Sequence, residues 1–411
     1  MDGATSSLLS TLLKYRPMKF LLVVDDYLPA SIKVAARMMH DLALELQAQG
    51  HQVTVCTPDD GLNERFLIEE FEGVKVLRFK SGSIKNVSKV RRAINETLLS
   101  FRAWRSLKGY FKENQHDRVV YYSPTIFFGP LVKRLNKLWG SKSYLILRDI
   151  FPQWTVDSGL MKTTSPIYWY FKFFEAINYN AADVIGVQSP SNKAYFSGSK
   201  KYSHKLDVLY NWSSVVNDIE ISSFYREKYG LLDKVVFFYG GNIGHAQDMM
   251  NLARLAKALE SYPEAYFLFV GKGDEVGLIE QYIKDNSLNN IKCLPSVNQD
   301  EYQLMLSEFD VGLFSLHKDH KTNNFPGKLL GYMKHSTPIL GSVNKDNDLQ
   351  DVLVDAGAGF VSVNGEDDKL TNHAIQLIES VQLRKQMGES AYQLLKDTFS
   401  VSSAVKRLFH K

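Results

Sequence analysis

The apolar positions along this chain fall into two alternating kinds of segment: short continuous runs and longer stretches with helical spacing. Residues 19–25 (KFLLVVD) form the first continuous run, and residues 32–49 follow with apolar side chains every three or four positions. Gly50 ends the expected helix, and residues 51–57 (HQVTVCT) form a second run. Because continuous apolar runs are typical of parallel strands buried on both faces, the opening of the chain predicts a βαβ unit.

The same alternation continues through the first half of the chain and then restarts. Further strands are expected in the first half at residues 74–79, 119–122, 144–147 and 183–188. In the second half they are expected at 235–239, 266–270, 291–294, 311–314, 338–341 and 359–363, and amphipathic helices close the chain. Regular alternation of strands and helices predicts doubly wound parallel sheets.

The length of 411 residues exceeds what one hydrophobic core usually covers. We therefore expect an α/β fold with two Rossmann-like doubly wound parallel-sheet domains facing a cleft. The first domain should cover residues 18–205 and the second 206–411, with residues 206–234 as the join and the last helix free to pack back on the first domain. Ligands of such folds bind at the carboxyl ends of the strands.

Composition narrows the class of function. Lys and Arg exceed Asp and Glu by 49 to 45, a surplus too small for a general nucleic-acid binder. Cys56 and Cys293 lie far apart without metal-ligand spacing, which favours a reducing cytoplasm over a disulfide scaffold or a structural zinc site. Residues 1–17 lack the features of a signal peptide, and the apolar run 119–132 is too short and too rich in proline to span a bilayer.

Three segments of the second half carry candidate chemistry. Residues 237–249 (FFYGGNIGHAQDM) place Gly240, Gly241 and Gly244 between a strand and a helix, where backbone amides can hold a diphosphate. The same glycines also fit simple turn chemistry. The spacing matches neither the Walker nor the GxGxxG pattern, so a Walker ATPase is not expected.

The second segment, FLFVGKGDEV, repeats the glycine turn after the next strand and offers Lys272, which also fits a solvated turn lysine. The third segment, HKTNNFPGKLLGYMKHSTPILG, opens a helix after Pro326 and Gly327, with Lys328 in its first turn. A lysine there can point at the same diphosphate as the glycine turn.

In this order and spacing, the three segments resemble the donor half of GT-B nucleotide-sugar glycosyltransferases, most closely glycosyltransferase family 4. The likeness covers the chain from residue 18 to about residue 411. It implies that the second domain binds a nucleotide-sugar donor, most simply a UDP-sugar. The implied donor-binding residues are Gly240, Gly241, Asn242, Gly244, Lys272, Ser296, Asn323, Asn324, Phe325, Pro326, Gly327 and Lys328.

The chain departs from the family at one informative place. The family commonly carries two glutamates eight positions apart, whereas this chain has Asn323 and Gly331 there. Donor ribose and sugar recognition must then come from other groups, with Asn323, Asn324 and the backbone of residues 325–328 as candidates. Branches that handle N-acetylated deoxyamino sugars look similar here, and residues 147–160 (LRDIFPQWTVDSGL) also resemble the L-fucosamine transferase branch.

The first domain is expected to hold the acceptor. Residues 23–37 (VVDDYLPASIKVAAR) place Asp25 and Asp26 after the first strand, but Ala30 and Ser31 replace the family's paired glycines. Arg148 and Asp149 end another strand, and residues 122–125 (YSPT) end the strand before it. We name Arg148, Asp149 and Asp26 as catalytic candidates, and a buried Arg–Asp pair is the alternative for the first two.

Two further segments are compatible with contact to a membrane surface. Residues 80–112 hold nine Lys or Arg against one acid, Glu96, with interleaved aromatic residues. Each such cation near an anionic surface contributes about 1 kcal/mol of attraction. Residues 167–174 (IYWYFKFF) are aromatic at six positions, which fits an interfacial anchor, an acceptor-lipid wall or core packing. A solvated helix with a buried apolar side equally explains the basic segment.

The resemblance predicts a retaining, metal-independent transferase that needs no cofactor and sits peripherally on the inner face of the cytoplasmic membrane. It would move a sugar from a UDP-sugar to a lipid-linked saccharide in the synthesis of a bacterial surface polysaccharide, O-antigen or capsule. Two alternatives remain open: a nucleotide-sugar 2-epimerase, which would turn over without acceptor, and a noncatalytic nucleotide-sugar-binding protein, which the missing glutamates would allow.

Overall fold

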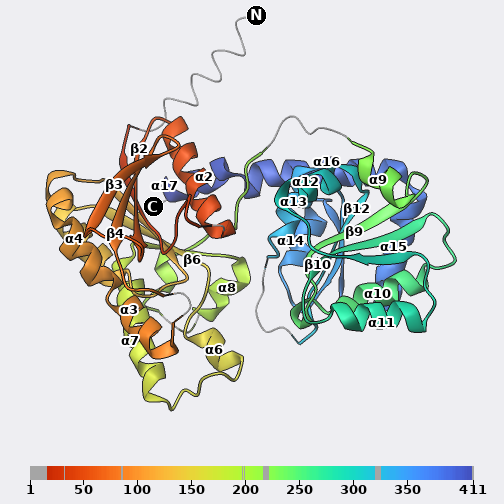
Figure 1. Ribbon diagram of the computed structural model, residues 1–411, viewed down its shortest axis with the longest axis horizontal. Coiled ribbons are helices and arrows are strands. Elements are labelled where there is room, and N and C mark those ends of the chain that lie inside the picture. Colours follow the sequence, from red (N-terminus) through yellow and green to blue (C-terminus); the bar gives the residue numbers. More distant parts are fainter. Residues whose placement is uncertain are drawn as a thin grey trace, which may run out of the picture. The chain divides into compact units, whose positions relative to one another are not determined.

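The computed structural model describes residues 16–31, 33–84, 87–196, 198, 200–215, 222–319 and 325–409. The chain divides into two compact units between Leu209 and Tyr210, and the segment from Ala404 onward belongs to the first unit. Each unit is an α/β layer structure built on one sheet (Figure 1). No helix in the described ranges combines the length and apolarity that crossing a membrane requires.

The first unit is built on an eight-stranded sheet with the order β3-β4-β2-β1-β5-β6-β7-β8. Every neighbouring pair is parallel except β3 with β4. The strands are β1 (Lys19–Val23), β2 (Gln52–Asp59), β3 (Phe66–Phe71), β4 (Val74–Lys80), β5 (Arg118–Ser123), β6 (Lys142–Leu147), β7 (Val184–Val187) and β8 (Leu206–Val208). The central strands are buried on both faces, as their continuous apolar sequences require.

Helices cover this sheet and join its parallel strands. They are α2 (Val34–Ala48), α3 (Lys89–Thr97), α4 (Leu99–Glu113), α5 (Gly129–Trp139), α6 (Gln153–Asp157), α7 (Pro166–Ala181) and α8 (Pro190–Tyr195), followed by a 3-10 turn, η1 (Ser203–Lys205). The last helix, α17 (Val401–Phe409), ends in the first unit. There the Phe409 ring lies 5.6 Å from the ring of Phe20 on β1, and Arg407 pairs with Asp207 at 3.5 Å.

The second unit is built on a six-stranded, wholly parallel sheet with the order β11-β10-β9-β12-β13-β14. Its strands are β9 (Val235–Asn242), β10 (Ala265–Lys272), β11 (Ile291–Leu294), β12 (Val311–Ser315), β13 (Ile339–Val343) and β14 (Gly359–Val363). Its helical elements are α9 (Phe224–Tyr229), η2 (His245–Gln247), α10 (Met249–Ala258), α11 (Val276–Asp285), α12 (Gln299–Glu308), α13 (Lys328–Lys334), α14 (Leu349–Asp355), α15 (Asp367–Glu379), α16 (Val381–Leu394) and η3 (Leu395–Phe399).

Helices lie on both faces of this second sheet, with α10 and α11 on one side and α12, α13 and α16 on the other (Figure 1). Successive residues of a strand alternate between the two cores. Phe237 and Phe267 stack in one core with ring centroids 4.8 Å apart, whereas Phe238 and Leu268 belong to the other. Burial on both faces explains why the sequence of β9 is apolar without interruption.

The doubly wound architecture predicted from the sequence is confirmed, and each expected strand is present. Two strands were missed. β3 (Phe66–Phe71) is an antiparallel edge strand whose residues are largely exposed, so its sequence lacks a continuous buried run. β8 (Leu206–Val208) has three residues, too few for any period to be detected, and it extends the first sheet into the segment expected to be the join.

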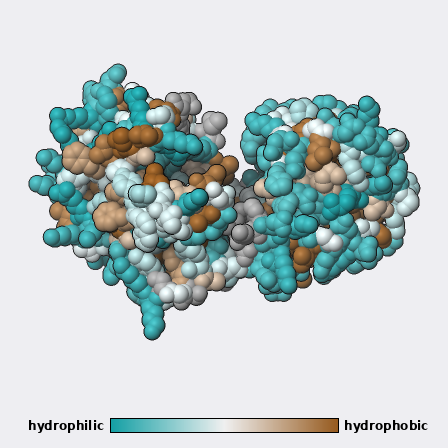
Figure 2. Space-filling model, turned by 90° about the horizontal axis from the view of Figure 1, so that it is seen from below, coloured by the Kyte–Doolittle hydropathy of each residue, from teal (hydrophilic) through white to brown (hydrophobic). Residues whose placement is uncertain are grey.

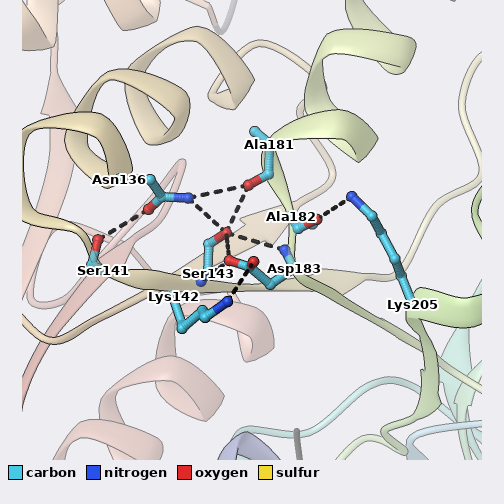
Figure 3. Close-up of polar contacts among 8 residues, drawn as sticks. All are labelled: Asn136, Ser141, Lys142, Ser143, Ala181, Ala182, Asp183 and Lys205. Atoms are coloured by element: carbon cyan, nitrogen blue, oxygen red, sulfur yellow. Dashed lines mark hydrogen bonds and ion pairs between the residues drawn. The ribbon is translucent and has the colours of Figure 1, made fainter.

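A buried polar network fastens the amino ends of β6 and β7 to helices α5 and α7 (Figure 3). The Asn136 amide donates to Ser143 Oγ at 2.9 Å and to the Ala181 carbonyl at 3.2 Å, and it accepts from Ser141 Oγ at 3.1 Å. The Asp183 carboxylate accepts from the Ser143 amide at 2.8 Å. These bonds satisfy backbone groups that the strand and helix ends would otherwise leave unpaired.

We predict that Asn136→Ala destabilises the first unit by about 1–3 kcal/mol, because it removes an amide that serves three buried or half-buried partners. Thermal unfolding should shift down by several degrees. Lys142→Ala is the matched control, since its ion pair with Asp183, at 3.4 Å, is exposed and should contribute less than about 1 kcal/mol. Equal melting temperatures for Asn136→Ala and the wild type would mean that the network adds no stability.

Candidate functional site

The donor-binding candidates of the second unit gather where β9 and β10 end. Gly240, Gly241 and Asn242 close β9 and pair in register with Val270, Gly271 and Lys272 of β10. The two glycine segments are therefore neighbours at one edge of the sheet, as the sequence led us to expect. The Ile243 amide donates to the Lys272 carbonyl at 3.0 Å, so an anion at this edge would meet the amides that follow, at the start of η2.

The three predicted glycines differ in the reason for which glycine is needed. A Cβ on Gly240 would fall 2.2 Å from the Tyr302 ring, and a Cβ on Gly244 would fall 2.6 Å from Asp274. These two positions are explained by packing within the chain. Gly241 has φ +135°, in the region that favours glycine, and a Cβ there would point at the Lys328 ammonium, 3.4 Å away. Of the three glycines, Gly241 is therefore the one whose missing side chain leaves space beside the Lys328 ammonium.

Lys328, in the first turn of α13, presents an unusual ammonium group. Its Nζ is buried and has no hydrogen-bond partner within the described ranges. It lies 3.3 Å from the centroid of the Tyr239 ring, so a cation–π contact is the only favourable electrostatic contact that we identify for it there. Burial holds the pKa of this amine well below its ordinary value. An unneutralised buried cation is costly, and an anion beside Gly241 would relieve that cost.

The remaining donor candidates take varied positions. Asn242 turns its amide to Gln247 at 2.8 Å, and Lys272 and Ser296 are exposed at the ends of β10 and β11. The Phe325 ring is buried against Phe399, with centroids 4.6 Å apart, so only its backbone can face a ligand. Pro326 is half-buried and Gly327 is exposed just before α13, whereas Asn323 and Asn324 lie outside the described residues.

Sequence reasoning missed a cluster of ionisable side chains beside these glycines. The Glu275 carboxylate lies 3.4 Å from His245 Nδ1, and its other oxygen is buried without a hydrogen-bond partner among the described residues. The His245 ring packs 4.5 Å from that of His317, whose backbone amide donates to Ala246. His245 directly follows Gly244 and Glu275 closes the second glycine turn, so both stood within the quoted segments and were passed over.

In the first unit, the acidic pair after β1 is tied to one lysine. Lys33 Nζ lies 3.1 Å from Asp26 and 3.7 Å from Asp25. Burial raises the pKa of Asp25, and the neighbouring Lys33 charge partly offsets the shift. Asp25 thus combines a carboxylate with a desolvated position, which is a feature of functional sites as well as of structural ion pairs.

Arg148 and Asp149 follow β6, where Arg148 is half-buried and Asp149 is exposed. Arg148 donates to the Leu209 carbonyl at 2.6 Å, and burial lowers its pKa to about 10. Burial raises the pKa of Asp149, with the Arg148 charge opposing the shift. The guanidinium therefore has a structural contact at the last strand of the sheet, and the Asp149 carboxylate is the better placed of the two to meet a ligand.

A pocket of about 1400 Å³ in the first unit brings some of these groups together. Asp25, Asp149 and Lys33 line it, whereas Asp26 and Arg148 are not among its lining residues. The rest of the wall is largely apolar and comes from α3, α6, α7 and the loop before α5. Both carboxylates follow strands of one parallel sheet, which explains why residues more than a hundred positions apart share one pocket.

Comparison with known families divides the chain as the fold does. Residues 35–212 match the family described as Glycosyltransferase Family 4, and residues 222–394 match the family described as Glycosyl transferases group 1. Among curated proteins, the Probable glycosyltransferase WbjE of Pseudomonas aeruginosa is 22% identical over 54% of this chain and 56% of its own length. The chain thus spans little more than half the length of that relative. WcaI of Escherichia coli K12, whose name assigns it to colanic acid biosynthesis, is 23% identical over 76% of this chain and 80% of its own.

Solved structures show the same architecture. HepE of Anabaena, in complex with UDP, superposes with a TM-score of 0.65 at 16% identity and covers 95% of this chain and 98% of its own. WaaG, a glycosyltransferase involved in lipopolysaccharide biosynthesis, gives a TM-score of 0.59 at 16% identity over 95% and 100% of the two chains. The two family models therefore match successive segments of the chain, first Glycosyltransferase Family 4 and then Glycosyl transferases group 1, and the chain has the GT-B fold of these solved structures.

Proposed function

We propose that this protein is a glycosyltransferase that moves a sugar from a UDP-linked donor to a hydroxyl group of a lipid-linked saccharide. The observation that carries the donor half of the proposal is the buried Lys328 ammonium, which lacks a hydrogen-bond partner within the described ranges and faces the open side of Gly241. One relative named for colanic acid biosynthesis and a structural neighbour solved with UDP support the same proposal.

The chemistry asks the protein to stabilise a leaving diphosphate. Negative charge develops on the phosphate oxygens as the bond to the sugar breaks, and preorganised donors there lower the barrier. Lys328 would supply a full positive charge at low dielectric, and the backbone amides after Ile243 would supply hydrogen bonds. We expect this protein-derived charge to serve without a divalent metal.

Catalytic candidates on the acceptor side are carboxylates of the first unit. We assign to Asp149 the task of orienting the acceptor hydroxyl, with Asp25 as a second acceptor of hydrogen bonds in the same pocket. Asp26 and Arg148 are positioning residues: the first holds Lys33 at 3.1 Å, and the second anchors the end of β6 to Leu209. We further propose that the transfer retains the anomeric configuration and that the donor sugar is an N-acetylated deoxyamino sugar, such as N-acetyl-L-fucosamine.

The proposal predicts that UDP-N-acetyl deoxyamino sugars raise the melting temperature of the protein, because a ligand that binds only the folded state stabilises it. Transfer to a polyprenyl-linked saccharide should follow in buffer that contains EDTA. Conversion of the UDP-sugar without any acceptor would instead identify an epimerase. Stabilisation by UDP-sugars without transfer to any of a panel of lipid-linked acceptors would favour a noncatalytic binding protein.

Lys328→Met should change stability and affinity in opposite directions. The lowered pKa of Lys328 means that the folded state holds this proton less tightly than the unfolded chain does. Near neutral pH, removing the charge should therefore raise the melting temperature of the ligand-free protein. The same substitution should weaken UDP binding at least tenfold, measured by calorimetry. Lys284→Met, at an exposed lysine of the same unit, should change neither quantity. A lower melting temperature with unchanged UDP affinity would make Lys328 a structural residue.

We also propose a peripheral position on an anionic membrane. The α4 part of the basic segment has a buried apolar side, since Leu107 and Phe111 belong to the core, so the cations of α4 lie on its other side. Four of the unit's cations, Arg65, Lys80, Arg102 and Arg105, line one small cavity of about 300 Å³ that no acidic residue lines. Concentrated positive charge of this kind attracts anionic headgroups.

Arg65→Gln combined with Arg105→Gln should release the protein from phosphatidylserine vesicles in a sedimentation assay. Each cation near the surface contributes about 1 kcal/mol, so the pair should lower the partition coefficient at least tenfold at low salt. Lys257→Gln combined with Lys284→Gln removes the same charge from the second unit and should leave vesicle binding unchanged. Identical binding of the wild type and both double variants would rule out this cavity as the membrane contact.

A further inference from the structure

The pocket of the first unit has a largely apolar wall, which binding of a polar acceptor sugar does not explain. Its volume of about 1400 Å³ exceeds the roughly 300–1000 Å³ usual for small-molecule sites. Several of its lining residues are large apolar side chains that are open to solvent: Val90 is 72% exposed, Leu160 74%, Ile94 54% and Ile167 49%. Apolar surface of this extent in one concave place is a mark of ligand or membrane contact.

Aromatic side chains form a continuous path from the carboxylates to this exposed rim. Phe151, two residues after Asp149, packs 4.7 Å from Phe171 of α7, and Phe171 also contacts Phe127 at 6.4 Å. Tyr170, which precedes Phe171 on α7, is partly exposed and shares a 2.5 Å hydrogen bond with Thr97 of α3. The bond closes α3 onto α7, so the two helices bound one groove.

The helices that carry the rim lie together in the fold. Figure 1 places α3, α6 and α7 at one end of the first unit, and the space-filling view from that side shows apolar areas interrupting its hydrophilic surface (Figure 2). Trp154 of α6 and Trp169 and Phe173 of α7 add further exposed aromatic side chains to these elements. Three separate chain segments therefore contribute to one apolar rim.

Cations stand within the same pocket. Lys33 pairs with the acids after β1 and Arg92 pairs with Glu96 at 2.8 Å. Lys89 and Lys162 also line the pocket, and neither has a carboxylate within ion-pair distance among the residues that the structure describes. The pocket thus offers carboxylates for hydroxyl groups, uncompensated ammonium groups for phosphate and an apolar groove for a hydrocarbon chain.

We propose that this pocket binds the lipid end of the acceptor, with a long hydrocarbon chain between α3, α6 and α7 and its phosphate groups beside Lys89 and Lys162. The inference rests on the proposed function for the identity of the acceptor, but the pocket belongs wholly to the first unit. The hydrocarbon chain of the lipid leaves the bilayer and enters the groove at Ile94 and Ile167. The lipid phosphates then hold the saccharide at a fixed distance from Asp149. Recognition of the lipid phosphate, rather than of the bare sugar, sets the orientation of the acceptor.

The experiment measures binding of farnesyl diphosphate to the full chain by calorimetry, with farnesol and inorganic pyrophosphate as separate probes. Farnesyl diphosphate should bind at least tenfold more tightly than either fragment. Ile94→Glu combined with Ile167→Glu should weaken its binding at least tenfold, since two carboxylates would line the rim. Leu138→Glu, at a similarly exposed leucine of α5 outside the pocket, is the matched control and should bind as the wild type does.

Lys89→Gln combined with Lys162→Gln should remove the preference for farnesyl diphosphate over farnesol while leaving farnesol binding unchanged. Equal affinity of the wild type and the Ile94/Ile167 variant, or equal affinity for farnesyl diphosphate and pyrophosphate, would overturn the proposal. Titration of UDP into the same variants reports the second unit separately. If the wild type did not bind UDP, the proposed function would be refuted. Binding of farnesyl diphosphate by the same protein would still support the assignment of the pocket to the lipid.

Discussion

Parallel strand pairing is the constraint on which both units depend. Within the described residues, twelve of the fourteen strands have only parallel neighbours, and β3 and β4 form the one antiparallel pair, so nearly every connection must cross a face of a sheet before the next strand begins. The helices that make these crossings bury both faces, and the chain emerges from each strand at the same edge. This rule explains why Asp25 and Asp149 share one pocket in the first unit. It also explains why Gly241 and Lys272 lie on neighbouring strand ends in the second.

The buried parallel strands could be predicted because their sequences are long, uninterrupted apolar runs. β9 and β10 are buried on both faces, and their sequences predict little else. β3 follows a different rule: it pairs antiparallel at the sheet edge through a turn at Glu72 and Gly73, both with positive φ, and its mixed sequence resembles a loop. Periodicity is informative where burial is complete and weak at an edge.

The candidate sites were predictable in kind but not in detail. Glycine turns and a lysine after Pro326 and Gly327 are visible as a sequence pattern, yet no pattern shows that Lys328 Nζ is buried against Tyr239. In the same way, Arg148 and Asp149 are neighbours in sequence, but only the carboxylate reaches the pocket because the guanidinium turns toward Leu209. Pocket walls assembled from α3, α6 and α7 depend on tertiary packing and leave no contiguous signature.

The antiparallel strand β3 also bears on how this protein stays apart from its own copies. An edge strand offers unpaired backbone groups to any other chain, and Phe66, Leu67 and Ile68 here are between 40% and 44% exposed. The run ends in Glu69 and Glu70, and Glu69 is held by the buried Arg78 guanidinium. Two carboxylates beside three exposed apolar side chains act as gatekeepers against edge-to-edge assembly. Resistance of the first unit to edge-to-edge assembly is thus assigned to the β3–β4 hairpin, whose last residue, Lys80, also lines the cavity proposed as the membrane contact.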